Sequence, residues 1–316
     1  MIGASGRQFT ICAVNRAVFT MTNLCNLNGT ITPEQDARIP VLDRGFLFGD
    51  SVYEVMRTRD GVPFAWPEHF ERLRASADGI ALPIEQSDTD LMRTVKDTLR
   101  AAGNAESYIR VIISRGTGTA PNIDLAYAPG PPTCVILVRD LPPVKDTTVR
   151  LAVIPRRRTD RRALDPAIKS GNYLNNLLGL AEAKASGATD CLFLNNDGQV
   201  TEASTANFWL VEDGAVRTPP LGAGLLAGIT RRLLFEMAAE RGFDLAEAEL
   251  TATELASADE MFLSSTLRNI VPVTHVDGRP LRDGRAGPVT RELATAFEGF
   301  CAARTTERYA PAFAAI

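Results

Sequence analysis

The chain has 316 residues, of which 45% are hydrophobic and 23% charged, and its 34 Lys and Arg against 38 Asp and Glu give a formal net charge of −4. This acidic balance argues against nucleic-acid binding, and no apolar run approaches the roughly 20 residues that a membrane span needs. Five scattered cysteines without a Cys-x-x-Cys pair, together with two histidines, disfavour a disulfide framework or a metal site and favour a reduced, cytoplasmic protein.

The first 20 residues are interrupted by arginines and are expected to be an extension, so the folded part is expected to begin near Met21. Strand and helix patterns then alternate through an expected small α/β domain at residues 21–139. An Asn-Gly pair at 28–29 and an Asp-Gly pair at 60–61 predict two hairpin turns. The other elements expected in this half are helices over 67–78, with Gly79 past the end, and over 89–102, with Gly103 as the stop, and strands over 107–116 and 133–140.

The stretch "LPPVKDTT" combines two prolines with charged and polar residues, so residues 140–147 are the expected linker to a larger domain at residues 148–316. The elements expected there are strands beginning at 149, 190, 207 and 260, helices closed by Gly187 and Gly242, hairpin turns at 197–198, 213–214 and 277–278, and a final helix over 287–300. Two unlike α/β halves predict a small-molecule site in the cleft between them.

Lysine is rare in this chain, because Lys96, Lys145, Lys169 and Lys184 are the four lysines among its 34 basic residues. Arginine stays protonated, whereas a desolvated lysine can lose its proton and attack a carbonyl. Lys169 alone lies between an apolar residue and a Ser-Gly turn, in "DPAIKSGNYLNN", and this predicts a lysine that forms a Schiff base with an aldehyde cofactor. A surface lysine at a helix start is the alternative.

Other candidate residues suit the remaining parts of such a cofactor. Glu202 in "GQVTEASTANFWLV" precedes small residues that leave room for a flat ring, and a buried carboxylate there would keep a pyridine nitrogen protonated; a solvent-facing edge-strand carboxylate is the alternative. At residues 228–230 a loop becomes a helix. The free N–H groups at this helix start and the hydroxyl of Thr230 are expected to form a phosphate cradle. A Thr230 that only caps the helix is the alternative. Thr266 in "FLSSTLRNI" offers a further hydroxyl. Arg72 in "EHFERLRAS" contacts a phosphate or pairs with a glutamate of its own helix.

The motifs described above occur in one order with two further stretches, "LDRGFLFGDSVYEVMR" and "GPVTRELATAF". In this combination the chain, from Leu24 to the terminal helix, resembles the class IV aminotransferases, the pyridoxal-phosphate enzymes of fold type IV. The resemblance implies an α/β (α+β) fold of two α/β domains with the active site in the cleft between them. It also implies pyridoxal 5'-phosphate as cofactor and a homodimer in which the neighbouring small domain closes the site.

The resemblance assigns roles to individual residues. Lys169 matches the catalytic lysine, Tyr173 the tyrosine that bonds the cofactor's O3′, and Glu202 the partner of the ring nitrogen. The positions that match the ring-face residue and the phosphate cup are Leu226, Arg72, Ile229, Thr230 and Thr266. The substrate-binding positions that it implies are Phe48, Tyr53, Tyr108, Arg110, Arg115 and Leu267.

The substrate motifs point to more than one group of this family. Tyr108 and Arg110 in "YIR" resemble the branched-chain group, whereas Tyr53 and Val55 in "GDSVYEV" resemble the D-amino acid and (R)-amine groups. Arg115 resembles a carboxylate-holding arginine of the D-amino acid enzymes. "ISRG" also resembles the aminodeoxychorismate lyases, although a lysine in place of Arg110 would have favoured that reading.

We therefore expect a ping-pong transaminase for a hydrophobic, branched-chain-like amino acid and a 2-oxo acid such as 2-oxoglutarate, with a D-amino acid or (R)-amine transaminase as the alternative. Arg110 and Arg115 are five apart, so their side chains point to opposite faces of a regular strand. We expect Arg110 to face the site, beside the substrate carboxylate. We expect Arg115, where the chain leaves the strand, to serve the second carboxylate of dicarboxylates.

Overall fold

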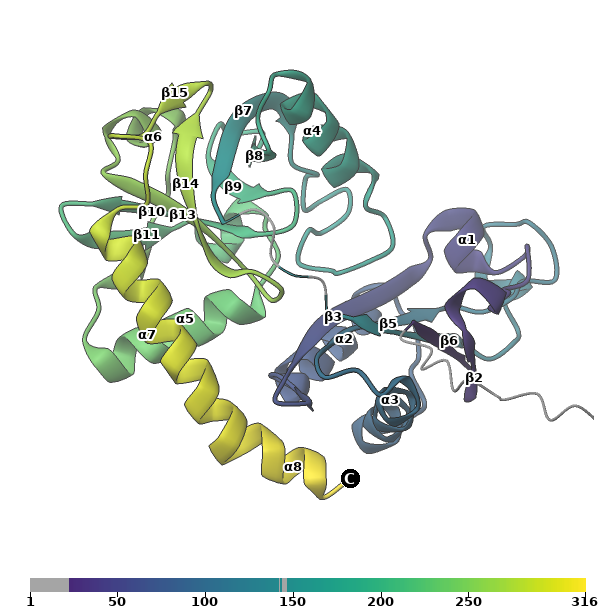
Figure 1. The fold of residues 1–316 in the computed structure, drawn as a ribbon. Helices are drawn as coiled ribbons and strands as arrows, with labels where there is room; N and C mark the ends of the chain where they lie inside the picture. Colours follow the sequence, from purple (N-terminus) through teal and green to yellow (C-terminus); the bar gives the residue numbers. More distant parts are fainter. Residues whose placement is uncertain (1–22, 142, 144–146) are drawn as a thin grey trace, which may run out of the picture.

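The computed structural model describes residues 23–141, 143 and 147–316, so the expected extension over 1–20 and part of the expected linker lie outside the described residues. The described chain forms two lobes, each with helices packed around a β-sheet (Figure 1). Within these residues no helix is both long and apolar enough to cross a bilayer. The domain limits given above stay predictions.

The small lobe is built on a six-stranded antiparallel sheet in the order β2-β1-β6-β5-β3-β4. Its first hairpin turns as expected at Asn28 and Gly29, whose φ angles are 50° and 90°. Fully buried residues alternate with half-buried ones along most of β5, so Ile109 and Val111 face the core while Arg110 faces the opposite side. The strands are β1 (Leu24–Leu27), β2 (Thr30–Pro33), β3 (Ser51–Arg59), β4 (Val62–Pro63), β5 (Ser107–Ser114) and β6 (Thr133–Asp140).

Two helices, α2 (Trp66–Gly79) and α3 (Asp88–Ala102), share the apolar core of this sheet. The end of α3 is as predicted, with Gly103 in the left-handed region at φ 67°. The prediction for Gly79 was wrong, because Gly79 is the last residue of α2 and the left-handed turn occurs at Ala81. Gly79 instead allows a close contact, since a Cβ there would lie 2.7 Å from the side chain of Ile168, which precedes Lys169.

The large lobe holds nine strands in the order β12-β11-β10-β13-β14-β7-β8-β9, with β15 paired to β14. One further pair, Asn207 of β10 with Glu202 of β9, closes six of these strands into a ring. The expected hairpin turns at 197–198, 213–214 and 277–278 are confirmed. The strands are β7 (Val149–Arg157), β8 (Asp190–Leu194), β9 (Val200–Ala203), β10 (Asn207–Glu212), β11 (Ala215–Thr218), β12 (Leu245–Glu247), β13 (Glu260–Ser265), β14 (Asn269–Val276) and β15 (Arg279–Pro280).

The expected helices of this lobe are present as α4 (Leu174–Ala185), α5 (Ile229–Arg241) and α7 (Pro288–Arg304), and α5 and α7 pack on the buried Trp209. After α7 the chain continues through η4 (Thr305–Tyr309) and α8 (Ala310–Ala314) to the small lobe, where Phe313 and Ile316 pack on its core (Figure 1). This C-terminal crossing, like β12, was not predicted. The other unpredicted elements are short: α1 (Arg44–Phe48), α6 (Ala252–Ser257), η1 (Glu34–Asp36), η2 (Leu125–Tyr127) and η3 (Leu221–Ala223).

Candidate active site

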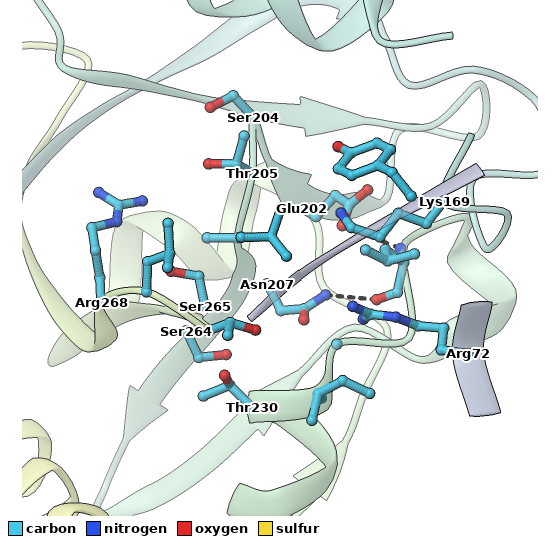
Figure 2. A pocket seen from close by; sticks show the side chains of 18 of the residues that line it. Arg72, Lys169, Glu202, Ser204, Thr205, Asn207, Thr230, Ser264, Ser265 and Arg268 are labelled. Atoms are coloured by element: carbon cyan, nitrogen blue, oxygen red, sulfur yellow. Dashed lines mark hydrogen bonds between the residues drawn. The ribbon is translucent and has the colours of Figure 1, made fainter. Parts of the chain in front are cut away.

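A cavity of about 500 Å³ lies between the lobes, and β3, α2 and β5 of the small lobe line it together with the closed end of the large-lobe ring (Figure 2). This volume is within the range of small-molecule sites. The expected site residues that line it are Tyr53, Arg72, Tyr108, Arg110, Lys169, Tyr173, Glu202, Leu226, Ile229, Thr230, Thr266 and Leu267. The cavity therefore brings together all of the expected residues except Phe48 and Arg115.

Lys169 belongs to an irregular segment that is docked on the edge of β3. Its carbonyl accepts a hydrogen bond from the Tyr53 N–H at 3.0 Å, and its own N–H donates to Ser76 Oγ at 3.1 Å. Two residues later Gly171 N–H donates to the carbonyl of Ser51, at a place where a Cβ would lie 2.4 Å from Ser51 Oγ. The lysine is thus held by the small lobe although it belongs to the chain of the large one.

The Lys169 side chain faces aromatic rings. Its Nζ lies 4.3 Å from the ring centre of Tyr53 and 5.6 Å from that of Tyr173, and the two rings meet edge to face. Among the described residues no carboxylate pairs with Nζ. Burial, with the neighbouring Tyr173, raises the pKa of the Tyr53 phenol, which therefore stays neutral. Aromatic rings, and no carboxylate among the described residues, therefore surround this amine.

Glu202 is 4% exposed, so the alternative of a solvent-facing carboxylate does not apply. Arg158 Nε donates to its Oε1 at 2.9 Å, Arg158 Nη2 lies 2.9 Å from the same oxygen, and Leu226 N–H donates to its Oε2 at 3.2 Å. The Nη1 of Arg158 in turn donates to the side-chain oxygens of Asn175 and Asn176. This arrangement keeps a buried carboxylate in a fixed orientation on the cavity wall.

The N-terminus of α5 opens into the cavity. Its N-cap is Gly228, which has no side chain to cap the helix, so Thr230 lies inside the first turn and is not the N-cap. A Cβ at Gly228 would lie 1.9 Å from Asn207 Oδ1, which explains the glycine. The first N–H groups of a helix have no partner within it and carry the positive end of its dipole. With the hydroxyls of Thr230 and Thr266 they form a site for an anion.

Arg72 reaches the same place from α2, and it pairs with Glu54 of β3 instead of with a glutamate of its own helix. Its Nε and Nη2 donate to the two carboxylate oxygens at 2.7 and 2.8 Å, and its Nη1 donates to the carbonyl of Ala227 at 2.8 Å. His69 Nδ1 lies 2.7 Å from the same carboxylate. Of the five guanidinium N–H groups three are thereby used, and two are left for an anion.

Arg110 and Tyr108 line the opposite part of the small-lobe wall. The Arg110 guanidinium lies 4.1 Å from the Tyr53 ring centre, and its Nε, although buried, has no hydrogen-bond partner among the described residues. Shielding the Nε donor of a half-buried guanidinium from water without a partner is costly unless a ligand supplies an acceptor. Such a group suits a carboxylate.

Two of the expected substrate residues lie outside this cavity. Arg115 does not line the cavity, because its Nε donates to Asp50 at 2.8 Å and its terminal nitrogens donate to the carbonyls of Ala81 and Ile80 at 2.8 and 2.7 Å. These bonds make Arg115 a structural link at the end of β5, and the dicarboxylate role expected for it would require breaking them. Phe48 ends α1 outside the cavity, with its ring 5.1 Å from the Arg44 guanidinium.

Several lining residues were not predicted individually. Asn207 donates from Nδ2 to the Leu226 carbonyl at 2.9 Å, and its signal in the sequence was its position just after the small residues that follow Glu202. Arg268 adds a cation at the turn between β13 and β14. Arg158 carried no signal, because its contact with Glu202 spans 44 positions. The other unpredicted lining residues are Val55, Ser204, Thr205, Ala206, Ser264 and Ser265.

Comparison with known proteins gives consistent matches. The family model "Amino-transferase class IV" matches residues 51–276. A putative branched-chain-amino-acid aminotransferase of Methanocaldococcus jannaschii is 35% identical, and the match covers 86% of this chain and 94% of the relative. A D-alanine aminotransferase of Listeria innocua is 34% identical, and the match covers 84% of this chain and 92% of the relative. The solved branched-chain aminotransferase of Thermoproteus uzoniensis with norvaline superposes with a TM-score of 0.82 at 31% identity, over 91% of this chain and 97% of its own.

Proposed function

The chain belongs to the class IV aminotransferases, pyridoxal-phosphate enzymes of fold type IV, and on that premise we propose that it transfers the amino group of a hydrophobic, branched-chain-like L-amino acid to a 2-oxo acid such as 2-oxoglutarate. The observation that carries the substrate proposal is the different placement of Arg110, on β5, and Arg115, just after this strand. Arg110 faces the cavity beside Tyr108, as the branched-chain resemblance requires. Arg115, the residue that resembles the D-amino acid enzymes, is bonded elsewhere.

The residues of the cavity fit pyridoxal 5'-phosphate. One amine, one buried carboxylate and one helix N-terminus match its aldehyde, its basic ring nitrogen and its phosphate. Gly228 keeps the backbone N–H groups of the first turn accessible, because any side chain there would collide with Asn207. When bound, the cofactor supplies a carbonyl that carries the amino group and a ring that withdraws electrons.

We assign the work of the chain's own groups as follows. Lys169 Nζ, which lies between the rings of Tyr53 and Tyr173, takes the proton from the substrate's α-carbon and returns it. Glu202, oriented by Arg158, holds the ring nitrogen, while Tyr173 holds the phenolic oxygen. The phosphate is bound by the groups already described at the N-terminus of α5, which are Arg72, Ile229, Thr230 and Thr266.

A half-reaction screen tests this function. The cofactor-loaded protein is mixed separately with L-leucine, D-alanine and (R)-1-phenylethylamine, and the cofactor's visible absorbance is followed. We expect the fastest change with L-leucine, and release of 4-methyl-2-oxopentanoate in equal amount. A faster change with either of the other donors would reject the L-amino acid assignment, and no change with any donor would reject amino transfer for these substrates.

A D-amino acid or (R)-amine transaminase is the second candidate, because Tyr53 and Val55 both line the cavity. In the sequence these two residues resemble that group, and the match to a D-alanine aminotransferase is nearly as high as to the branched-chain relative. The same screen separates the two candidates. The lyase alternative is less favoured because Arg110 stands where it would need a lysine.

We also propose a homodimer in the cytoplasm. Exposed apolar side chains gather where the Arg44 guanidinium of α1 binds the carbonyls of Asn122 and Ile123, and Phe46 and Ile123 are 67% and 79% exposed there. Burying such a patch against a second copy would remove it from water. The free thiols of the four described cysteines support a reducing compartment. Light scattering after size-exclusion chromatography tests the dimer, and a monomeric mass would refute it.

A further inference from the structure

Glu68, in the first turn of α2, is a buried carboxylate to which the site described above gives no role. Its side chain is 1% exposed, and it lies four residues before Arg72, so the two side chains belong to the same face of α2. Glutamate and arginine at this spacing are neighbours on a helix and can form an ion pair. Arg72 instead donates to Glu54 and to the carbonyl of Ala227. Glu68 must therefore be compensated by another group.

The partners of Glu68 come from the C-terminal crossing. Arg308 Nη2 lies 2.7 Å from Glu68 Oε1, and the Tyr309 hydroxyl donates to the same oxygen at 3.2 Å. Both residues belong to η4, through which the chain leaves α7 and crosses to the small lobe (Figure 1). Tyr309 is fully buried, and its ring centre lies 5.1 Å from that of Phe64, so packing fixes this contact. The end of the chain thus brings a positive charge to the helix that carries Arg72.

The charge of Arg308 matters because Arg72 has two buried carboxylates near it. It binds one of them, Glu54, and the other, Glu68, is one helical turn away. Glu68 Oε2 has no hydrogen-bond partner among the described residues, so Arg308 and the Tyr309 hydroxyl, both at Oε1, are the contacts seen for this carboxylate in the described chain. Without Arg308 an uncompensated negative charge would stay beside Arg72, where it would compete for the guanidinium and repel an anion.

We propose that Arg308 is a positioning residue for the cofactor's phosphate: by neutralising Glu68, it keeps the two remaining N–H groups of Arg72 available to the phosphate. Arg308 does not line the cavity, so it acts through Glu68 and Arg72 without touching the cofactor. The inference rests on the phosphate site assigned above to Arg72, and it does not depend on which amino donor the enzyme uses.

Binding of the cofactor with and without its phosphate tests the proposal independently of turnover. The full-length chain, freed of cofactor, is titrated with pyridoxal 5'-phosphate and with pyridoxal, and visible absorbance reports binding. Pyridoxal keeps the ring and the aldehyde but lacks the phosphate. Arg308→Met is expected to weaken pyridoxal 5'-phosphate roughly tenfold and to leave pyridoxal within about twofold. A factor of this size is what one uncompensated charge gives at roughly 10 Å when the effective dielectric constant is about 20.

Further variants separate the charge of Arg308 from its packing. Arg308→Lys keeps the charge and should bind pyridoxal 5'-phosphate within about threefold of wild type. Glu68→Gln removes the negative charge, so it should restore most of the affinity lost in Arg308→Met. Alone, Glu68→Gln should tighten pyridoxal 5'-phosphate about two- to fivefold, because Arg308 is 44% exposed and stays solvated. Arg304→Met is the matched control, since Arg304 pairs with Glu240 of α5 and does not line the cavity; it should leave both ligands unchanged.

Each outcome decides for or against the proposal. Equal weakening of both ligands by Arg308→Met would mean that Arg308 only supports the fold, and no weakening of either would mean that the phosphate does not sense its charge; both results overturn the inference. So does a double variant that Glu68→Gln fails to restore, or an equally large phosphate-specific loss in Arg304→Met. If Arg308→Met does not fold, Glu68→Gln decides alone, because unchanged or weaker binding of pyridoxal 5'-phosphate would contradict the proposal.

Arg72→Met separates the inference from the site on which it rests. If Arg72→Met binds both ligands as the wild type does, the phosphate assignment is wrong and the inference falls with it. A phosphate-specific loss in Arg72→Met without one in Arg308→Met rejects the inference alone. A phosphate-specific loss in both variants, reversed by Glu68→Gln in the second, supports it.

Discussion

The buried carboxylate of Glu54 offers the most direct test of how the anion site is built. Glu54 and His69 are both fully buried and lie behind Arg72, away from water. Burial raises the pKa of Glu54, but the charge of Arg72 and the hydrogen bonds from Arg72 and His69 outweigh burial and hold this pKa well below its usual range. We predict that Glu54→Gln, which keeps the shape and removes the charge, destabilises the small lobe.

The magnitude follows from the contacts. Arg72 donates to both carboxylate oxygens, and His69 Nδ1 lies 2.7 Å from one of them. A glutamine presents a single acceptor oxygen, and its NH2 group would face a donor. Removing one partner of a buried ion pair leaves the other charge uncompensated and costs about 3–5 kcal/mol. This is a large part of the roughly 5–15 kcal/mol that holds a typical domain folded.

Hydrogen exchange followed by mass spectrometry is the suitable assay, because it reports each lobe separately. Amides of α2 and β3 should exchange about a hundredfold faster or more in Glu54→Gln, and those of α5 and α7 at nearly the wild-type rate. Glu71→Gln is the control, since Glu71 lies on the same helix as Arg72 but is 68% exposed and pairs with Arg232 at the surface. Equal exchange in α2 for wild type, control and Glu54→Gln would refute the reasoning.

The remaining predictions concern the cavity and its pH dependence. Borohydride reduction should fix the cofactor on the peptide that contains Lys169, and Lys169→Ala should abolish this attachment. Glu202→Gln should still bind the cofactor but transfer amino groups slower by orders of magnitude, which stopped-flow absorbance measures. Arg110→Ala should lower kcat/KM for monocarboxylic and dicarboxylic substrates alike, by a loss of about 2–5 kcal/mol of binding free energy. Arg115→Ala should lower the melting temperature with little change in specificity. Burial lowers the pKa of His69, so the histidine of the unfolded chain takes up a proton at a higher pH than that of the folded chain. The free energy of unfolding should therefore fall as the pH drops below about 6.5. His69→Gln should flatten this part of a stability–pH profile.

Much of this site could be predicted from short stretches of sequence. Lys169 and Glu202 each lie in a local pattern whose meaning does not depend on distant residues. The choice of Arg110 over Arg115 followed from the resemblance of "YIR" together with strand periodicity, and β5 is regular and pairs Val55 with Arg110 directly. Side-chain direction in a regular strand is a local property, so the sequence contained it.

The errors and omissions involve contacts between distant parts of the chain. Arg115 was expected to bind a substrate carboxylate because nothing near it in the sequence indicated that the carbonyls of Ile80 and Ala81 would accept its hydrogen bonds. Gly79 was interpreted as a helix stop because its contact with Ile168 spans 89 positions, a contact that local rules do not include. Arg158 was missed for the same reason. Tertiary contacts decide whether a polar side chain is used in the structure or remains available to a ligand.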